Sequence, residues 1–486
     1  MGNEQLVLEH DRSLQKHSIP PVESFIGEVL GLDTAEITDE LEYRSILNWD
    51  SLGHVNLILA LEKLLGIVID DEMRTQLTSV PSIRRFIQQH SSGVQASEAE
   101  LPHPADVHET ARTDKIFRGL AGVTFDRTRT TLIDGKAGRL QYRGYSIHDL
   151  VTFSCFEETA YLLVYGTLPT QPQLETFKHQ LAASRSLPPE LYRIIESIRD
   201  AQPVEVLRTA VSALACFDEH RQDGTTDAMN MRIIRLIAQI PTIIAAHHAI
   251  RNRTPITIPH STLPHAANFL YMLQGELPTE QAARIVDKVF ILHADHGSNA
   301  SAFTARVVAG TKSDLYAAVT AAVSAFAGSL HGGAIESVMT MVLEIGHPDR
   351  AEEYIRRLQE QKQPVMGFGH RVYQTEDPRA RHLKQAAYQL SLELQKPVYY
   401  EILEAVVKAM KPYMAKGMDV NVDFYASVIY YLLGLPKDLF IPVFAAGRMP
   451  GWIAQIQEQY DNNILIRPLL QYVGEEDRPY IAIGQR

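Results

Sequence analysis

Residues 156–166, FEETAYLLVYG, decide the class of fold that this chain adopts. Their apolar side chains recur every three or four positions, as on one face of a helix, and a glycine follows the last of them. Patterns of the same kind fill most of the chain beyond this point, whereas long alternating strand patterns and internal repeats are absent. The exception is a short hairpin, in which residues 130–133 and 139–142 flank the turn 134–138. We therefore predict an all-α fold with a small hairpin near the start of its main body.

Length and composition indicate an ordinary globular protein with more than one domain. The chain has 486 residues, of which 45% are hydrophobic and 21% charged. Its only cysteines are Cys155 and Cys216, so we expect no disulfide framework and a cytoplasmic location. No apolar run approaches the length of about 18 residues that a membrane span needs, and the N-terminus lacks the order of a secretory signal.

Acidic residues are concentrated at the N-terminal end. Residues 1–90 hold 15 Asp and Glu against 7 Lys and Arg, a net charge of −8 out of −12 for the whole chain. This distribution argues against nucleic acid as a partner. An acidic module can dock on basic partner surfaces, but a merely solubilising surface would have the same charge. Charge alone leaves both interpretations open.

Residues 17–90 read as a compact helical bundle. An apolar stripe over residues 22–30 is closed by Gly31, and a second amphipathic helix begins at Asp50 and is closed by Gly66. A last helix starts at residues 81–83. We predict four helices for this unit.

The stretch that opens the second of these helices resembles acyl and peptidyl carrier proteins. It reads NWDSLGHV over residues 48–55, and LLGIVI follows at 64–69. In that family the serine carries a 4′-phosphopantetheine arm, so the resemblance implies this cofactor on Ser51 and a phosphopantetheinyl transferase as a partner. A helix N-terminus tolerates the negative phosphodiester of such an arm. Without its setting, Asp-Ser-Leu would be an ordinary helix start.

Three short motifs in the body carry groups suited to proton transfer at carbon. They place His331 in LHGGA, His370 in GFGHRVY and Asp423 in NVDF. Glycines let the backbone approach a ligand closely, and a neutral imidazole can donate a hydrogen bond to a developing enolate oxygen. Apolar neighbours tend to raise the pKa of Asp423 and make it a stronger base. Taken singly, the histidines also suit glycine-capped helix ends, and Asp423 suits a helix N-cap.

Together and in this order, the three motifs resemble citrate synthases. The likeness covers residues 113–486 and is closest to the branch with citrate and 2-methylcitrate synthases. Further matching stretches are IDG (133–135), YRGY (142–145), LLVYGTLP (162–169), LHADH (292–296), NAS (299–301), DPRA (377–380), GRMPGW (447–452) and IRP (466–468).

The resemblance implies a role for each of the three groups. Asp423 would remove the α-proton of an acyl thioester, and His331 would stabilise the resulting enol or enolate. His370 would polarise and protonate the keto oxygen of oxaloacetate as the carbon–carbon bond forms. The reaction would be an acyl transfer in which the acyl group becomes an alkyl group, and a coenzyme A thioester is one donor that the family uses.

The resemblance also implies an anion-binding set. Arg379, Arg448 and Arg467 match the arginines that bind the carboxylates of the keto acid, and His296 matches the histidine that binds oxaloacetate. In the family, the arginine that matches Arg467 comes from the partner subunit, so a homodimer is implied. His293 and His296 have the spacing of a metal pair, but no third ligand motif accompanies them, so we expect no metal.

The implied architecture is a two-domain, mostly helical body behind a carrier module. The carrier-like domain would occupy residues 17–90, and the small, polar stretch 91–112 would be a linker. A large domain would comprise residues 113–335 and 433–486, and a small domain residues 336–432. The reactive groups would then lie between the two domains, and no membrane or nucleic acid would take part.

Several residues depart from the family pattern on the acyl-donor side. Gly297 stands where glutamate is usual, Ser329 where proline is common, Ile335 where asparagine is usual, and Gln374 where many relatives carry Lys or Arg. These departures and the fused carrier suggest that the donor is a thioester on the Ser51 arm. The hypothesis is that this thioester condenses with oxaloacetate or a similar 2-keto acid to give a citrate-like product. The reaction would belong to specialised biosynthesis and would involve partner enzymes.

Two alternatives remain beside this hypothesis. One is an ordinary citrate or 2-methylcitrate synthase that uses free acyl-CoA, with the carrier serving another enzyme. The other is a non-catalytic dimeric scaffold that displays the carrier.

Overall fold

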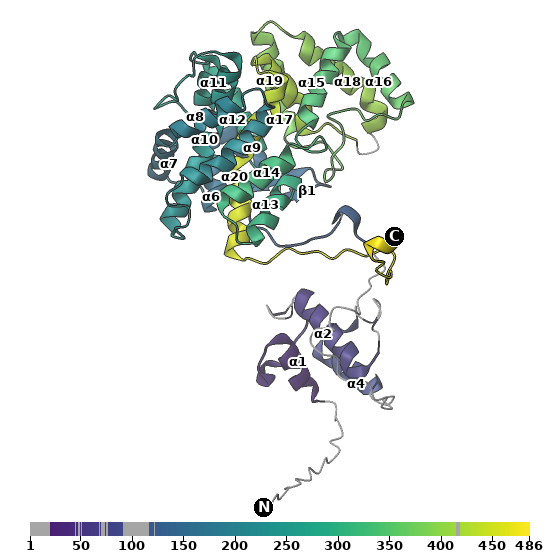
Figure 1. Ribbon diagram of the computed structural model, residues 1–486. Helices are drawn as coiled ribbons and strands as arrows, with labels where there is room; N and C mark the ends of the chain where they lie inside the picture. Colours follow the sequence, from purple (N-terminus) through teal and green to yellow (C-terminus); the bar gives the residue numbers. More distant parts are fainter. Residues whose placement is uncertain are drawn as a thin grey trace, which may run out of the picture. The chain divides into compact units, whose positions relative to one another are not determined.

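The computed structural model divides the chain into two compact units, Met1–Val123 and Thr124–Arg486. Each unit is described by itself (Figure 1). The structure describes residues 20–43, 45, 46, 49, 51–67, 69, 73, 76–90, 116–120, 122–414 and 418–486, with the backbone alone at 51–53 and 55.

The first unit is a small helical domain with a core of its own. The described helices that form its core are α1 (Val22–Leu30), the short 3-10 helix η1 (Thr34–Glu36), α2 (Ser51–Leu65) and α4 (Val80–His90). They enclose apolar side chains that include Phe25, Trp49, Leu61 and Ile83. Gly31 ends α1 with a φ of 66°, as the sequence predicted. The described part holds three α-helices, so the predicted four-helix bundle is not established, and the predicted linker 91–112 lies outside the described residues.

The second unit begins with the predicted hairpin. Strand β1 (Thr131–Asp134) pairs with β2 (Arg139–Tyr142) in antiparallel register, Thr131 opposite Tyr142. The turn between them is closed by the Asp134 carboxylate, whose Oδ1 accepts hydrogen bonds from the backbone N–H groups of Lys136 and Ala137 at 3.0 and 2.9 Å. A two-residue strand, β3 (Tyr145–Ser146), extends the sheet beyond the two predicted strands.

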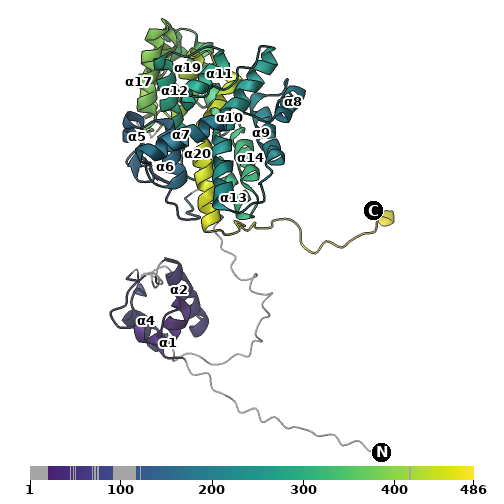
Figure 2. The same cartoon turned by 90° about the vertical axis from the view of Figure 1, so that its left-hand side faces the viewer.

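After the sheet, the unit is helical, which confirms the all-α prediction. Its α-helices are α5 (Ile147–Phe153), α6 (Phe156–Tyr165), α7 (Gln171–Ala183), α8 (Pro189–Ser197), α9 (Pro203–Leu214), α10 (Thr226–Asn252), α11 (His265–Gln274), α12 (Glu280–His293), α13 (Ala300–Gly310), α14 (Leu315–Phe326), α15 (Ala334–Ile345), α16 (Ala351–Glu360), α17 (Ala380–Glu393), α18 (Val398–Met414), α19 (Val422–Leu432) and α20 (Phe440–Asp461). Helix α20 packs against α6, α10, α12, α13 and α14 and forms the axis of the unit (Figure 2).

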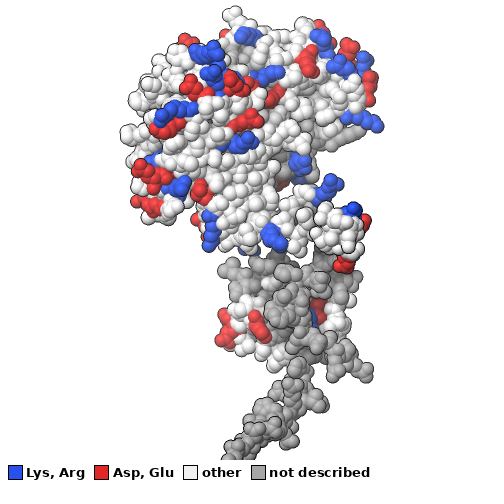
Figure 3. Space-filling model, viewed as in Figure 1, with Lys and Arg blue, Asp and Glu red and all other residues white. Residues whose placement is uncertain are grey.

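Helix α10 is long and apolar enough to cross a membrane by length and composition alone. Most of that apolar stretch is buried inside the unit, however, as in the core helix of a globular protein. On the face of this unit seen in Figure 3, basic and acidic side chains are interspersed.

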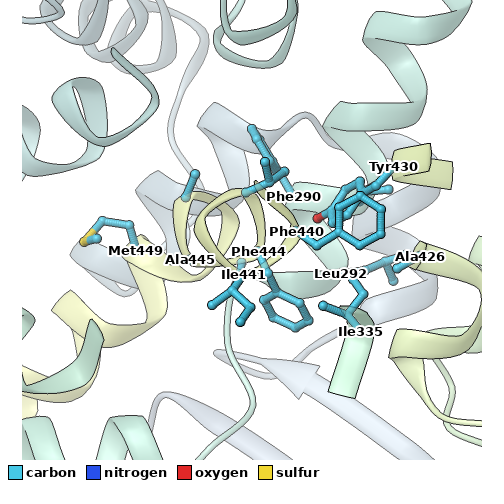
Figure 4. Packing of buried hydrophobic residues seen from close by; sticks show 14 of the residues in the cluster. Phe290, Leu292, Ile335, Ala426, Tyr430, Phe440, Ile441, Phe444, Ala445 and Met449 are labelled. Atoms are coloured by element: carbon cyan, nitrogen blue, oxygen red, sulfur yellow. The ribbon is translucent and has the colours of Figure 1, made fainter. Parts of the chain in front are cut away.

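The core under the candidate site joins four helices. Phe440, Ile441 and Phe444 of α20 pack with Phe290 and Leu292 of α12, Ile335 of α15, and Ala426 and Tyr430 of α19 (Figure 4). Ile335, one of the departures from the family pattern, is fully buried in this core. The ends of α12, α15 and α19, where His296, His331 and Asp423 lie, are therefore fixed by one block of packing.

Residues 124–486 form one compact unit, so the division into a large domain and a small domain at 336–432 stays a prediction. The chain beyond α20 forms an extended C-terminal segment, residues 462–486, with one short 3-10 helix, η8 (Ile483–Gln485), near its end (Figure 2). Its apolar side chains, such as Leu470 and Val473, are exposed.

Candidate active site

Backbone hydrogen bonds join the loops that carry His370 and Asp423. Gly369 N–H donates to the Asp419 carbonyl at 2.8 Å, and Asn421 N–H donates to the Gly367 carbonyl at 2.9 Å. Gly367 has a φ of 84°, and a Cβ there would lie 2.6 Å from the Phe424 ring. Only glycine fits this close approach, so GFGH is a sterically required turn and not merely a flexible one.

His370 is held as a neutral hydrogen-bond donor. Its Nδ1 accepts from the backbone N–H groups of Val372 and Tyr373 at 3.0 and 3.1 Å, so the ring proton is on Nε2. Burial, aided by the positive charge of Arg379, lowers the pKa of His370 to about 4.

Asp423 lies in the first turn of α19. The N-cap is Asn421, whose side chain accepts from Asp423 N–H at 3.1 Å, so the alternative that Asp423 itself is the N-cap is wrong. Burial raises the pKa of Asp423 to about 7, against the opposing charge of Arg379. The residue keeps partial solvent contact. Such a carboxylate is a stronger base than an exposed one.

His331 is fixed in the opposite tautomer. The backbone N–H of Ser301 donates to His331 Nε2 at 3.3 Å, and the Ser301 hydroxyl lies 2.9 Å from the same nitrogen. Because Nε2 accepts, the proton is on Nδ1. The single proton of that hydroxyl is shared between His331 Nε2 and Asn299 Oδ1, which lies 2.7 Å away, and the hydroxyl oxygen accepts from Trp452 Nε1–H at 3.0 Å. Burial, with Arg448 nearby, lowers the pKa of His331 to about 4.

Two buried guanidinium groups provide positive charge beside these three groups. Arg379 donates through Nε and Nη2 to the Asp377 carboxylate at 2.9 and 2.7 Å, which orients it and leaves the Nη1 edge for another partner. Arg448 donates to the His293 carbonyl and lies over the Phe444 ring. Burial lowers the pKa of Arg448 to about 10, so an anion bound beside it would relieve an unfavourable buried charge.

His296 connects the arginines to His370. Its ring is buried, lies 5.0 Å from the His370 ring between centroids, and its Nε2 lies 3.2 Å from the Tyr373 hydroxyl. Burial, followed by the charges of Arg379, His370 and Arg448, lowers the pKa of His296 well below its usual value. It is therefore a neutral group suited to hydrogen bonding with an anion.

The structure thus brings six of the seven predicted side chains into one electrostatic neighbourhood: His296, His331, His370, Arg379, Asp423 and Arg448. The seventh, Arg467, is exposed on the C-terminal segment. Sequence reasoning gave no role to Tyr373, Asp377, Ser301 or Trp452, although all four lie within six residues of a predicted group. The sequence motifs therefore indicated which side chains lie close together, but not the atoms that hydrogen-bond to each of them.

The hairpin supports the segment that holds His296. Thr131 Oγ1 donates to Asp295 Oδ2 at 2.5 Å, and Tyr142 Oη donates to the Asp295 carbonyl at 2.9 Å. Gly451 of α20 comes so close that a Cβ would lie 2.0 Å from the Ala294 carbonyl oxygen. This segment is therefore clamped between the sheet and α20.

The possible metal pair has other partners. His293 stacks on Phe444 with ring centroids 3.5 Å apart, and its Nδ1 lies 3.2 Å from the Tyr430 hydroxyl. Within the part of the chain that the structure describes, no group of three or more His, Cys, Asp and Glu could hold a metal ion.

The helical body combines a carboxylate of raised pKa, two neutral imidazole donors and buried guanidinium groups. This combination is typical of the class of acid–base enzymes that act on small anions. Residues 119–469 match the family model described as "Citrate synthase, C-terminal domain". A citrate synthase of Deinococcus radiodurans is 43% identical over 373 residues, which are 76% of this chain and 99% of that protein. A 2-methylcitrate synthase of Corynebacterium glutamicum is 40% identical, covering 78% of this chain and 100% of that protein. The chain belongs to the citrate synthase family.

A solved structure supports the same assignment. The citrate synthase of Thermoplasma acidophilum, in a ternary complex with carboxymethyl coenzyme A and oxaloacetate, superposes with a TM-score of 0.72 at 32% identity. The alignment covers 76% of this chain and all of that one.

The prediction that 4′-phosphopantetheine on Ser51 is a cofactor of this enzyme is wrong. Full-length relatives match about three quarters of this chain, the family match begins only at residue 119, and the Thermoplasma complex contains a free coenzyme A derivative. The matched part of the chain therefore corresponds to nearly whole synthases and does not include Ser51. The prediction failed because a helix start at Ser51 was taken for a cofactor site, and the partner enzymes expected for the arm are not shown by these comparisons.

Proposed function

We propose that this protein condenses a short-chain acyl-CoA with oxaloacetate to give citrate or 2-methylcitrate. The observation that carries the proposal is the pair of opposite histidine tautomers, His331 with its proton on Nδ1 and His370 with its proton on Nε2, beside the raised-pKa Asp423. Such a set provides one base and two neutral donors, which the two carbonyl oxygens of this reaction require.

The roles follow from these protonation states. Asp423 takes the α-proton of the acyl thioester, and His331 Nδ1–H stabilises the negative charge that forms on the thioester oxygen. The enolate carbon then attacks the keto carbon of oxaloacetate, while His370 Nε2–H donates its proton to the keto oxygen. Water hydrolyses the resulting thioester and releases coenzyme A. Asp423 and His370 are restored by proton exchange, so no external oxidant or metal is needed.

Arg379, Arg448 and His296 would bind the oxaloacetate dianion. Both arginines are buried and already oriented by Asp377 and by the His293 carbonyl, so little conformational entropy is lost on binding. We propose that Arg467 of the partner subunit completes this set in a homodimer. The exposed apolar side chains of the segment that carries Arg467 support a second copy as its partner.

The acyl donor is then an acyl-CoA that is free in solution and not attached to the protein. Of the interpretations open at the sequence level, an ordinary synthase fits the comparisons better than a donor on the Ser51 arm. Residues 336–432 would form a small domain that closes over the substrates and excludes water. The likeness of residues 17–90 to carrier proteins stays a prediction without an assigned role.

The test is a coenzyme A release assay on the full chain with acetyl-CoA and propionyl-CoA, each with and without oxaloacetate. We expect oxaloacetate-dependent release, retained in Ser51→Ala and reduced between about 10²- and 10⁴-fold in Asp423→Asn. The preferred acyl group decides between citrate and 2-methylcitrate. Release that requires Ser51, or no release with either thioester, would refute the proposal.

A further inference from the structure

The turn of the β1–β2 hairpin contacts the loop that carries His370, although more than 200 residues separate them in the sequence. We propose that the hairpin turn, residues 134–138, is a positioning element for His370: it holds the peptide that fixes the tautomer and aim of this imidazole. The inference rests on the role proposed above for His370.

The contact is made by backbone against backbone. Gln374 N–H donates to the Gly135 carbonyl at 2.9 Å. A Cβ at Gly135 would lie 2.0 Å from the Val372 carbonyl oxygen and 2.7 Å from the Val372 carbonyl carbon. No side-chain rotation can relieve such a clash, because the opposing atoms are main-chain atoms. Glycine at position 135 is therefore a steric requirement of this approach.

The peptide that Gly135 touches is the one that orients His370. The carbonyl of Val372 and the N–H of Tyr373 belong to the same peptide unit, which is planar and rigid. Its oxygen faces Gly135, and its N–H donates to His370 Nδ1 at 3.1 Å. A displacement of the oxygen therefore moves the N–H, and with it the bond that keeps the His370 proton on Nε2.

The turn has a defined shape before it meets the loop. The two hydrogen bonds to Asp134 Oδ1 close it on one side, and the pairing of β1 with β2 continues from both ends. Gly138 makes a second close approach, since a Cβ there would lie 2.9 Å from Thr375 Oγ1. The strand behind the turn is anchored through Thr131 to Asp295, next to His296.

The chain that follows the hairpin also contacts the helix that begins beside Arg379. Beyond the hairpin, Ser146 caps α5, and His148 Nδ1 lies 2.8 Å from His382 Nε2 on α17. His382 is three residues after Arg379, which is one helical turn away. Residues 131–153 thus contact the elements of His296, His370 and Arg379, and set these three groups in register with one another.

The test combines kinetics with the spectrum of bound oxaloacetate labelled with ¹³C at the keto carbon. A strong donor at the keto oxygen polarises the carbonyl and moves its resonance away from the position in water, which a merely structural contact would not do. In Gly135→Ala we expect tight oxaloacetate binding, a resonance shifted back toward its position in water, and kcat lowered by about 10- to 100-fold. Ala137→Ser, which adds one atom at an exposed site of the same turn, is the matched control and should behave as wild type.

A second pair of variants adds no atom beside Val372. Asp134→Ala removes the acceptor that closes the turn and should give the same spectral change in weaker form, whereas Asp134→Asn keeps an Oδ1 acceptor and should restore the wild-type spectrum. This pair decides the question if Gly135→Ala does not fold.

The outcomes separate this inference from the proposed function. If His370→Ala changes the carbonyl resonance but Gly135→Ala and Asp134→Ala do not, the hairpin is not a positioning element and the role of His370 stands. If His370→Ala itself leaves the resonance and kcat unchanged, the proposed function fails first.

Discussion

At the scale of single residues, Asp423 shows how a buried carboxyl group reduces the stability of its own fold. Its pKa is about 7 in the folded protein against a usual value of 3.8. Below pH 4 the carboxyl is neutral in both the folded and the unfolded chain. As pH rises from about 4 to 7 the unfolded chain ionises first, so the folded state loses stability over that window and no more above it.

We therefore expect Asp423→Asn to lower activity strongly and yet stabilise the protein. The gain in the free energy of unfolding over wild type should grow by about 1–2 kcal/mol between pH 5 and pH 8, a value reduced for the partial solvent contact of this side chain. Urea denaturation of both proteins at the two pH values measures it. A gain that is larger at pH 5 than at pH 8 would contradict the raised pKa.

Ser301 links His331 to the buried core. Its hydroxyl accepts the indole N–H of Trp452, which lies in the fully buried part of α20. Ser301→Ala should lower the free energy of unfolding by about 1–3 kcal/mol, because it leaves that N–H without a partner. In a Trp452→Phe background the same change should cost much less. Equal costs in both backgrounds, measured by denaturant unfolding, would show that the indole bond is not the cause.

Which residues lie close together could be predicted from the sequence, but how each is held could not. His331, His370 and Asp423 were predicted from their motifs because such chemistry needs particular side chains in glycine-rich turns. The tautomers depend on Ser301 N–H and Tyr373 N–H, which are backbone groups that every residue type except proline shares. Their direction is set by tertiary packing, so the sequence carries no local sign of it.

At the scale of elements, some helix ends in this body are capped from other helices. Cys155, the N-cap of α6, gives its helix no side-chain bond within the described structure, and Asp287 of α12 accepts from Phe156 N–H at 3.0 Å in its place. In the same way, Glu157 accepts from His265 N–H at the start of α11. The sequence predicted the end of α6 at Gly166 correctly, since a C-terminal glycine acts locally, but a cap supplied across the core has no local signature.

Asp287→Ala should therefore destabilise the fold by about 1–2 kcal/mol, the usual cost of a lost cap. Asp287→Asn keeps an acceptor oxygen and should cost less. Burial, followed by the charge of Glu157, raises the pKa of Asp287 to about 7, so the folded state loses stability as pH rises from about 4 to 7 and the unfolded chain ionises first. Thermal unfolding at pH 4, where this loss has barely begun, checks both variants, and a larger loss in the Asn variant than in the Ala variant would exclude a capping role.

At the scale of the whole molecule, the chain is longer than the family members that it matches. Relatives are matched over 99–100% of their own length by about three quarters of this chain. The family was predicted correctly because its motifs spread over the whole body, whereas the cofactor prediction drew on residues 48–55 and 64–69 of one small unit. Evidence distributed along a fold constrains function more strongly than a single helix start does.

Removal of residues 1–112 should accordingly leave catalysis intact. The second unit is compact by itself and contains the six clustered site residues. We expect kcat and the KM for acyl-CoA to stay within about twofold of the full chain, since no group that contacts substrate is lost. A large rise in KM for acyl-CoA would instead assign the N-terminal unit a part in donor binding.

The position of Arg467 leads to a test of the dimer that does not depend on measuring assembly. If each site uses Asp423 of one protomer and Arg467 of the other, a mixed dimer of Asp423→Asn and Arg467→Ala has one site with both defects and one site with none. Random co-assembly of equal amounts makes half of all dimers mixed, so activity should recover to about a quarter of wild type. If Arg467 served the site of its own protomer, every site would keep one defect, and mixing two inactive variants would restore nothing.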